Sequence, residues 1–164
     1  MKELRFSLWL FLGVLIGLST GACKPKPMFE FSSEHRSALT DTILQMTDDL
    51  ADAISDRDAT RIQAMFAVGP YSKYISDGLV IPRDSLVLVL GSFYSGLSKL
   101  DFAWNRKEIE LISLDVATVT SWTSYTATTL QDQQITEKAV FTHLFIRQKG
   151  NWCVLSSHKS MQKP

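Results

Sequence analysis

Two histidines near the C-terminal end of the chain have the type and spacing to share a small-molecule site. Lys149-Gly150 is typical of a tight turn between two strands. With that turn, His143 lies opposite Ser156 and Phe141 lies opposite His158, and all four share one face of a sheet. Two imidazoles and a hydroxyl on an aromatic wall could bind a small ligand or exchange protons with it. A register shifted by one residue would send His143 to the opposite face from His158.

Other residues add candidates for the same pocket but no metal centre. Tyr71, Tyr74 and Trp104 could line its mouth, although aromatic residues there can equally be core, and a histidine in a strand can equally be structural. Two histidines need a third protein ligand to hold a metal, and the H-x-H, C-x-x-C and H-E-x-x-H spacings are absent. We therefore expect no metal and no cofactor. The clearest carboxylates fall in predicted turns and helix caps rather than in a pocket: Asp58, Asp77, Asp84 and Asp132.

The N-terminal segment is typical of an export signal. Lys2 and Arg5 precede an apolar stretch, residues 6–18, which is short for a membrane span. The following Ser19-Thr20-Gly21-Ala22-Cys23 resembles the lipobox of bacterial lipoproteins, in which the cysteine is acylated. Thr20 departs from that pattern, because lipoboxes usually have an aliphatic residue there. The alternative is ordinary cleavage that leaves Cys23 as a free thiol.

The predicted processing divides the chain into three parts. Residues 1–22 form the signal peptide, residues 23–32 the lipidated cysteine and a proline-rich tether, and residues 33–164 one domain. The chain would then be exported and anchored through Cys23 to a bacterial membrane. Lys24 favours an outer membrane, with the domain in the periplasm, under the enterobacterial sorting preference, and attachment at a cell surface is the alternative.

The charge balance excludes nucleic acid as a partner. The 164-residue chain has 17 basic and 17 acidic side chains, and loss of residues 1–22 leaves 15 basic and 16 acidic ones. A protein that binds phosphate backbones needs a basic surface. Hydrophobic content of 45% and charged content of 21% are typical of a globular domain.

Three helices are predicted in the first half of the domain. The first begins at Ser32-Ser33, and its apolar residues recur at steps of three and four: Leu39, Ile43, Met46, Leu50 and Ile54. Asp58 caps a second helix, which we expect to end near Gly69-Pro70. Asp77-Gly78 predicts a hairpin before the third helix, Ser85 to about Leu97. The apolar residues of the third helix are expected to be largely buried: Leu86, Leu88, Val89, Leu90, Phe93 and Leu97.

Four long strands follow these helices. The first is predicted from residue 101, with alternation through Leu111, and the others over residues 115–129, 135–147 and 152–159. A bulge is expected near Asn105 to Lys107, where the alternation changes parity. The order α-α-β-β-α-β-β-β-β indicates an α+β fold in which three helices pack on one face of a curved antiparallel sheet.

Short motifs in this order resemble the SnoaL-like and nuclear-transport-factor-like families. Ala53, Asp58 and Met65-Phe66-Ala67 are similar to the "A…GD…LFA" pattern of the second helix, and residues 77–84 are similar to the "DG…GRD" link. The stretch 150–160 is similar to the closing "GxW…H-x-H-x-S" strand, with Ser156 in place of its first histidine. The resemblance implies a cystatin-like cone with a cavity at its wide end.

Three functions fit this resemblance. The first is a binding module for a small, largely apolar ligand or a protein partner, and it is more consistent with the lack of a visible acid–base pair. The second is an isomerase, dehydratase or cyclase that uses pocket histidines, and the third is a structural envelope scaffold. Many relatives dimerise through the outer face of the sheet. The apolar stretch 139–146 predicts a homodimer through outward positions of the sheet: Trp122, Val140, Thr142 and Leu144. The alternative is that this stretch reflects only the β-propensity of a central strand, with no partner.

Overall fold

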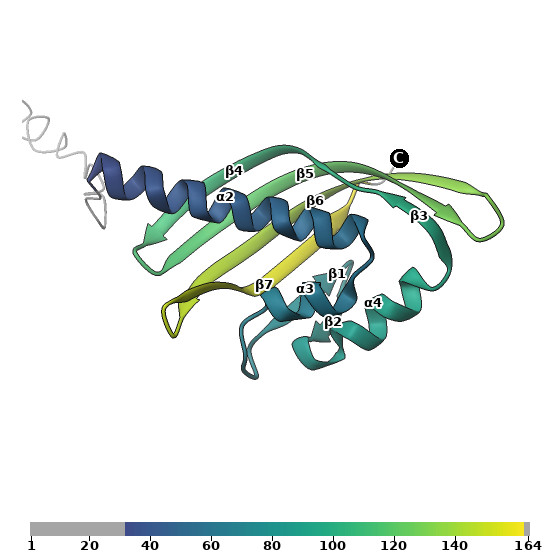
Figure 1. Ribbon diagram of the computed structural model, residues 1–164, viewed down its shortest axis with the longest axis horizontal. Coiled ribbons are helices and arrows are strands. Elements are labelled where there is room, and N and C mark those ends of the chain that lie inside the picture. Colours follow the sequence, from purple (N-terminus) through teal and green to yellow (C-terminus); the bar gives the residue numbers. More distant parts are fainter. Residues whose placement is uncertain (1–31, 163–164) are drawn as a thin grey trace, which may run out of the picture. The chain divides into compact units, whose positions relative to one another are not determined.

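The computed structural model describes residues 32–162, which begin with the long helix α2, Ser33–Ser55 (Figure 1). The side chain of Ser32 accepts a hydrogen bond from the backbone N of His35 at 3.3 Å, as the sequence predicts for this cap. Ile43 and Leu50 on the predicted stripe are buried. Cys23, the signal peptide and the tether before Ser32 lie outside the described residues.

The second helix is shorter than predicted. Asp58 caps α3, Ala59–Met65, and its carboxylate accepts a hydrogen bond from the backbone N of Arg61 at 2.8 Å. The predicted end near Gly69-Pro70 is wrong. Phe66 is already extended and forms a parallel bridge with Val154. Because the backbone of Phe66 pairs with the sheet, it cannot continue the helix.

The hairpin is confirmed, but its place in the sheet changes the predicted topology. Strands β1, Lys73–Ser76, and β2, Leu79–Pro82, are joined by Asp77 and Gly78 with φ values of 49° and 91°, as a tight two-residue turn requires. Strand β1 then pairs in parallel with β7, Asn151–Met161. The sheet is therefore mixed rather than wholly antiparallel.

The third helix ends before Leu97. A 3₁₀ turn, η1, Arg83–Ser85, leads into α4, Leu86–Tyr94, and Leu97 already belongs to strand β3, Leu97–Asp101. Leu97 pairs with Thr129, so sheet pairing ends the helix there. The prediction of a largely buried helix holds for Leu86 and is wrong for Leu88 and Phe93, which are exposed.

The remaining strands form the long part of the sheet. They are β4, Trp104–Ser113; β5, Val116–Thr129; and β6, Gln134–Gln148. The order is β2-β1-β7-β6-β5-β3, and β4 also pairs with β5. The predicted bulge is confirmed as a register shift between Trp104 and Arg106, where the side chain of Asn105 accepts a hydrogen bond from the backbone N of Ser124 at 2.7 Å.

Helices and sheet enclose one hydrophobic core. The inward face of the long strands packs against α2, and the indole of Trp104 donates a hydrogen bond to the backbone oxygen of Thr47 at 2.7 Å. Figure 1 shows α2 lying across the long strands, with α3 and α4 beside β1 and β2. The α+β class with three helices on one sheet is confirmed. The described residues belong to one compact unit with its own core, which is what autonomous folding requires. Within residues 32–162, no helix is both long and apolar enough to cross a membrane.

Candidate functional site

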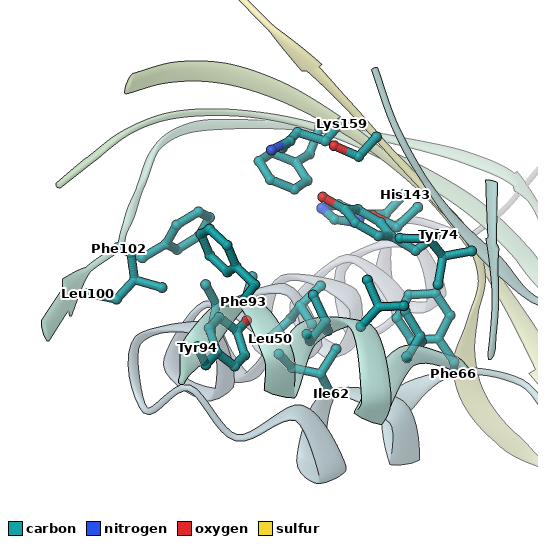
Figure 2. A pocket seen from close by; sticks show the side chains of 18 of the residues that line it. Leu50, Ile62, Phe66, Tyr74, Phe93, Tyr94, Leu100, Phe102, His143 and Lys159 are labelled. Atoms are coloured by element: carbon teal, nitrogen blue, oxygen red, sulfur yellow. The ribbon is translucent and has the colours of Figure 1, made fainter. Parts of the chain in front are cut away.

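A cavity of about 260 Å³ lies between the helices and the inward face of the sheet (Figure 2). Most of its wall is aliphatic or aromatic. The helical wall comes from α2, α3 and α4 and consists of Leu50, Ile54, Ile62, Leu86, Val89, Leu90, Phe93 and Tyr94. A cavity of this composition suits a small apolar molecule.

The polar groups of the cavity come from two neighbouring rows of the sheet. In the first row Ser157 pairs with Tyr74 on one side and with His143 on the other. In the second row Lys159 pairs with Ser76 and Phe141, and all six of these residues line the cavity. Adjacent rows on one face of a strand are about 7 Å apart. Strands β1, β7 and β6 therefore gather an imidazole, three hydroxyl groups and an ammonium on one wall.

His143 is the most unusual of these groups. It is 0% exposed, and within residues 32–162 neither ring nitrogen has a hydrogen-bond partner. Its ring stacks on Phe141 with 5.8 Å between centroids and meets Trp104 edge-on at 5.5 Å. Burial lowers the pKa of His143 to about 4, so the imidazole is neutral at pH 7. Buried polar atoms almost always have partners, and a bound molecule could supply one here.

The predicted register between the last two strands is wrong beyond Val154. Arg147 pairs with Trp152 and Phe145 with Val154, as expected from the turn, but Leu155 has no partner and Leu144 pairs with Ser156. This β-bulge places His143 opposite Ser157 and sends His158 to the outer face.

The bulge coincides with a change of partner on the other edge of β7. Val154 bonds there to the segment after α3, where the backbone N of Ala67 donates to its oxygen at 2.8 Å. From Ser156 onward the same edge pairs with β1. The extra residue lies where β7 changes partner.

The structure brings together only two of the six residues predicted from the sequence. Tyr74 and His143 line the cavity. Tyr71 is 77% exposed, and Trp104 packs beside His143 without belonging to the cavity wall. Ser156 and His158 are on the outer face, where His158 pairs with Thr142.

Sequence reasoning missed Ser76, Tyr94, Tyr125, Ser157 and Lys159 as lining residues. Ser157 and Lys159 follow from the bulge, which no turn signal indicates. Tyr94 is the last residue of α4 and lies in the helical wall of the cavity. Tyr125 could have been found from the alternation of β5, because it has the inward parity of Ala117 and Val119.

The tyrosine hydroxyls of the cavity stay protonated at neutral pH. Burial raises the pKa of Tyr74 to about 12, and the neighbouring hydroxyl of Ser76 partly opposes this. Burial also raises the pKa of Tyr94. For Tyr125, burial acts together with the carboxylate of Glu137, which accepts its hydrogen bond, and both raise the pKa. All three hydroxyls are therefore hydrogen-bond donors.

The wall of the cavity contains no carboxylate among the described residues. Asp77 and Glu137 lie near its polar side but point their oxygens at other protein groups, including the backbone N of Met161 and the hydroxyl of Tyr125. In residues 32–162 no cluster of three or more His, Cys, Asp or Glu could hold a metal ion. The cavity can thus bind and donate hydrogen bonds more readily than it can remove a proton.

Comparisons with known proteins place this arrangement in a family. A family model described as a SnoaL-like domain matches residues 43–164. Curated protein sequences give no match.

Solved structures show the same fold at low identity. A hexachlorocyclohexane dehydrochlorinase, LinA-type3, from Novosphingobium barchaimii has 15% identity and a TM-score of 0.70 over 80% of this chain and 92% of that chain. A putative scytalone dehydratase from Novosphingobium aromaticivorans has 11% identity and a TM-score of 0.72, over 80% and 89%. A nuclear transport factor 2-like protein from Salmonella enterica has 16% identity and a TM-score of 0.71, over 79% and 94%. Since the family model covers most of the chain, the protein belongs to the SnoaL-like domain family.

Proposed function

We propose that this domain binds a small, largely apolar molecule in its cavity and acts as a binding module. The observation that carries the proposal is the buried imidazole of His143, which has no hydrogen-bond partner and lies in the wall of a cavity of about 260 Å³. An apolar wall contributes affinity by removing ligand surface from water. A single neutral imidazole then orients the ligand, because it can accept one hydrogen bond and donate one.

The cavity opens to solvent near lining residues that are themselves exposed. Leu79 on β2 and Phe93 on α4 both line the cavity, and more than half of each residue is accessible to solvent. Exposed apolar side chains at an opening favour a ligand that is itself apolar.

A matched pair of substitutions on α4 tests the binding function. Val89 lines the cavity and Val87, on the same helix, does not. Val89→Trp should fill the cavity and weaken binding of the neutral fluorescent probe N-phenyl-1-naphthylamine at least about tenfold, whereas Val87→Trp should leave it unchanged. Fluorescence titration of residues 32–164 measures both. Equal probe affinity in wild type and Val89→Trp would contradict the proposal, and native mass spectrometry of the purified protein would identify a retained molecule.

An enzyme is the alternative, and one observation favours it. His143 places a basic nitrogen in an apolar cavity, and structures of the same fold include a dehydrochlorinase and putative dehydratases. Against it, a pKa of about 4 makes the imidazole a weak base, and no carboxylate bonds to either ring nitrogen. Conversion of a retained molecule by wild type, and loss of that conversion in His143→Gln, would favour the enzyme.

We infer that Cys23 is acylated and holds the domain at a bacterial membrane. The inference rests on the sequence Ser19-Thr20-Gly21-Ala22-Cys23 and the apolar stretch before it. Cys23→Ser should therefore move the protein from the membrane fraction to the soluble fraction, because one or more acyl chains no longer anchor it. Fractionation and the intact mass of the mature protein measure this. An unchanged membrane fraction would contradict acylation at Cys23.

The homodimer also stays a prediction. Trp122 and Val140 are paired on the outer face of the sheet, beside Thr142 and Leu144, and the guanidinium of Arg106 lies 4.7 Å from the centroid of the Trp122 ring. A second copy could cover this apolar surface. Light scattering on residues 32–164 should give twice the monomer mass, and Trp122→Glu should halve it. A monomeric wild type would contradict the prediction.

A further inference from the structure

Within residues 32–162, Lys159 is the one cationic side chain in the wall of this largely apolar cavity. Its strand position puts it opposite Phe141 and beside Ser76, and its side chain is only 19% exposed. Figure 2 shows Lys159 on the same wall as His143 and Tyr74, across from Leu50 and Tyr94. A lysine side chain that is about four-fifths buried gains from a nearby anion that compensates its charge.

The protein compensates this charge only weakly. Within residues 32–162, the one carboxylate within 4.0 Å of the Lys159 ammonium is that of Asp77, and Oδ2 of Asp77 lies at that limit. The same oxygen accepts a hydrogen bond from the hydroxyl of Ser76 at 3.1 Å, and Oδ1 accepts one from the backbone N of Met161 at 3.0 Å. Both oxygens of Asp77 are therefore already engaged by β1 and β7, and its contact with the Lys159 ammonium is a long one of 4.0 Å.

The neighbours of Lys159 in the cavity are hydrogen-bond donors. The hydroxyl of Tyr74 on β1 and that of Ser157 in the next row of β7 are donors on this wall, whereas the hydroxyl of Ser76 already donates its proton to Asp77. The phenol of Tyr74 keeps its proton at neutral pH, because its pKa is about 12. An ammonium with hydroxyl donors beside it matches the oxygens of a carboxylate.

We propose that the cavity binds a small monocarboxylic acid, with its carboxylate at Lys159 and its apolar body against the helical wall. The inference rests on the ligand-binding function proposed above and specifies the ligand class. The carboxylate would form an ion pair with Lys159 on the sheet side of the cavity. Leu50, Ile62 and Leu90 would pack against the apolar part of the ligand.

Two probes of equal size and different charge test the proposal. 2-Naphthoate and 2-naphthamide have the same apolar body, and only the first is an anion at pH 7. Wild-type residues 32–164 should bind 2-naphthoate about tenfold more tightly than 2-naphthamide in calorimetric titration. Lys159→Met should abolish this preference by weakening 2-naphthoate alone. Lys138→Met is the control, because Lys138 is exposed and lies on the outer parity of β6, and it should preserve the preference.

The possible results separate the two proposals. If wild type binds both probes equally, the acid inference is wrong and the binding function stands. If wild type binds neither probe, the ligand-binding function fails with it. If Lys159→Met loses both probes to the same extent, Lys159 shapes the cavity rather than recognising charge, and the acid inference is again overturned.

Discussion

Replacing Phe145 with alanine should lower the free energy of unfolding by about 3–5 kcal/mol, the range measured for large aromatic side chains in other cores. Phe145 is 0% exposed, and it pairs with Val154 and lies opposite Ala117 on β5, where both neighbours are also fully buried. The side chain of Ala117 is too small to fill the cavity that Phe145→Ala would leave. Denaturant unfolding of residues 32–164, followed by circular dichroism, measures the loss.

Phe93 provides the matched control for Phe145. Phe93 lies on α4 and is 52% exposed, so about half of this residue already contacts solvent in the folded state. Phe93→Ala therefore removes less buried surface than Phe145→Ala. We expect a loss below about 1 kcal/mol for this variant. Equal losses for both variants would show that Phe145 is not at the centre of the core.

Acidification from pH 7 to pH 5 should destabilise the protein by about 2 kcal/mol through His143 alone. The pKa of His143 is lowered from 6.5 to about 4 in the fold, because burial disfavours the imidazolium. Between these values the unfolded chain binds a proton that the folded chain does not bind. Stability is therefore retained above pH 6.5 and is lost as the pH falls toward 4. Urea unfolding at both pH values gives the change.

Two histidine variants isolate this contribution. His143→Gln removes the titrating group, so its stability should change between pH 7 and pH 5 by about 2 kcal/mol less than that of wild type. His158→Gln changes an exposed histidine on the outer face and should keep the full dependence. The same pH dependence in wild type and His143→Gln would mean that His143 is not a buried neutral imidazole.

Local signals predicted the elements of this fold well. Ser32 and Asp58 cap helices as expected, and Asp77-Gly78 makes the expected turn, because caps and tight turns depend on a few adjacent residues. The ends of the second and third helices were wrong, because Phe66 and Leu97 are drawn into sheet pairing by strands far away in the sequence. Helix ends set by tertiary contacts leave no local signal.

The candidate site was predictable only in part, with two of its six predicted residues in the cavity, for the same reason. The alternation of β6 is regular, and it places His143 on the inner face together with Phe141 and Phe145. In β7 the alternation breaks at Leu155. The sequence therefore assigned every residue after Leu155 to the wrong face of the sheet. The break falls where β7 changes its partner on its other edge, and a pattern within the strand cannot reveal that change.

The bulge at Leu155 determines which side chains of β7 face the cavity. If β7 paired with β6 in a regular register, with no bulge at Leu155, every residue after Leu155 would change face. Ser156 and His158 would then turn inward, and Ser157 and Lys159 would turn outward. One backbone irregularity therefore determines whether the cavity offers an ammonium or a second imidazole, with no change in amino-acid composition. Moving that irregularity along the strand would replace a lysine and a serine in the wall by a histidine and a serine, without any substitution in the sequence.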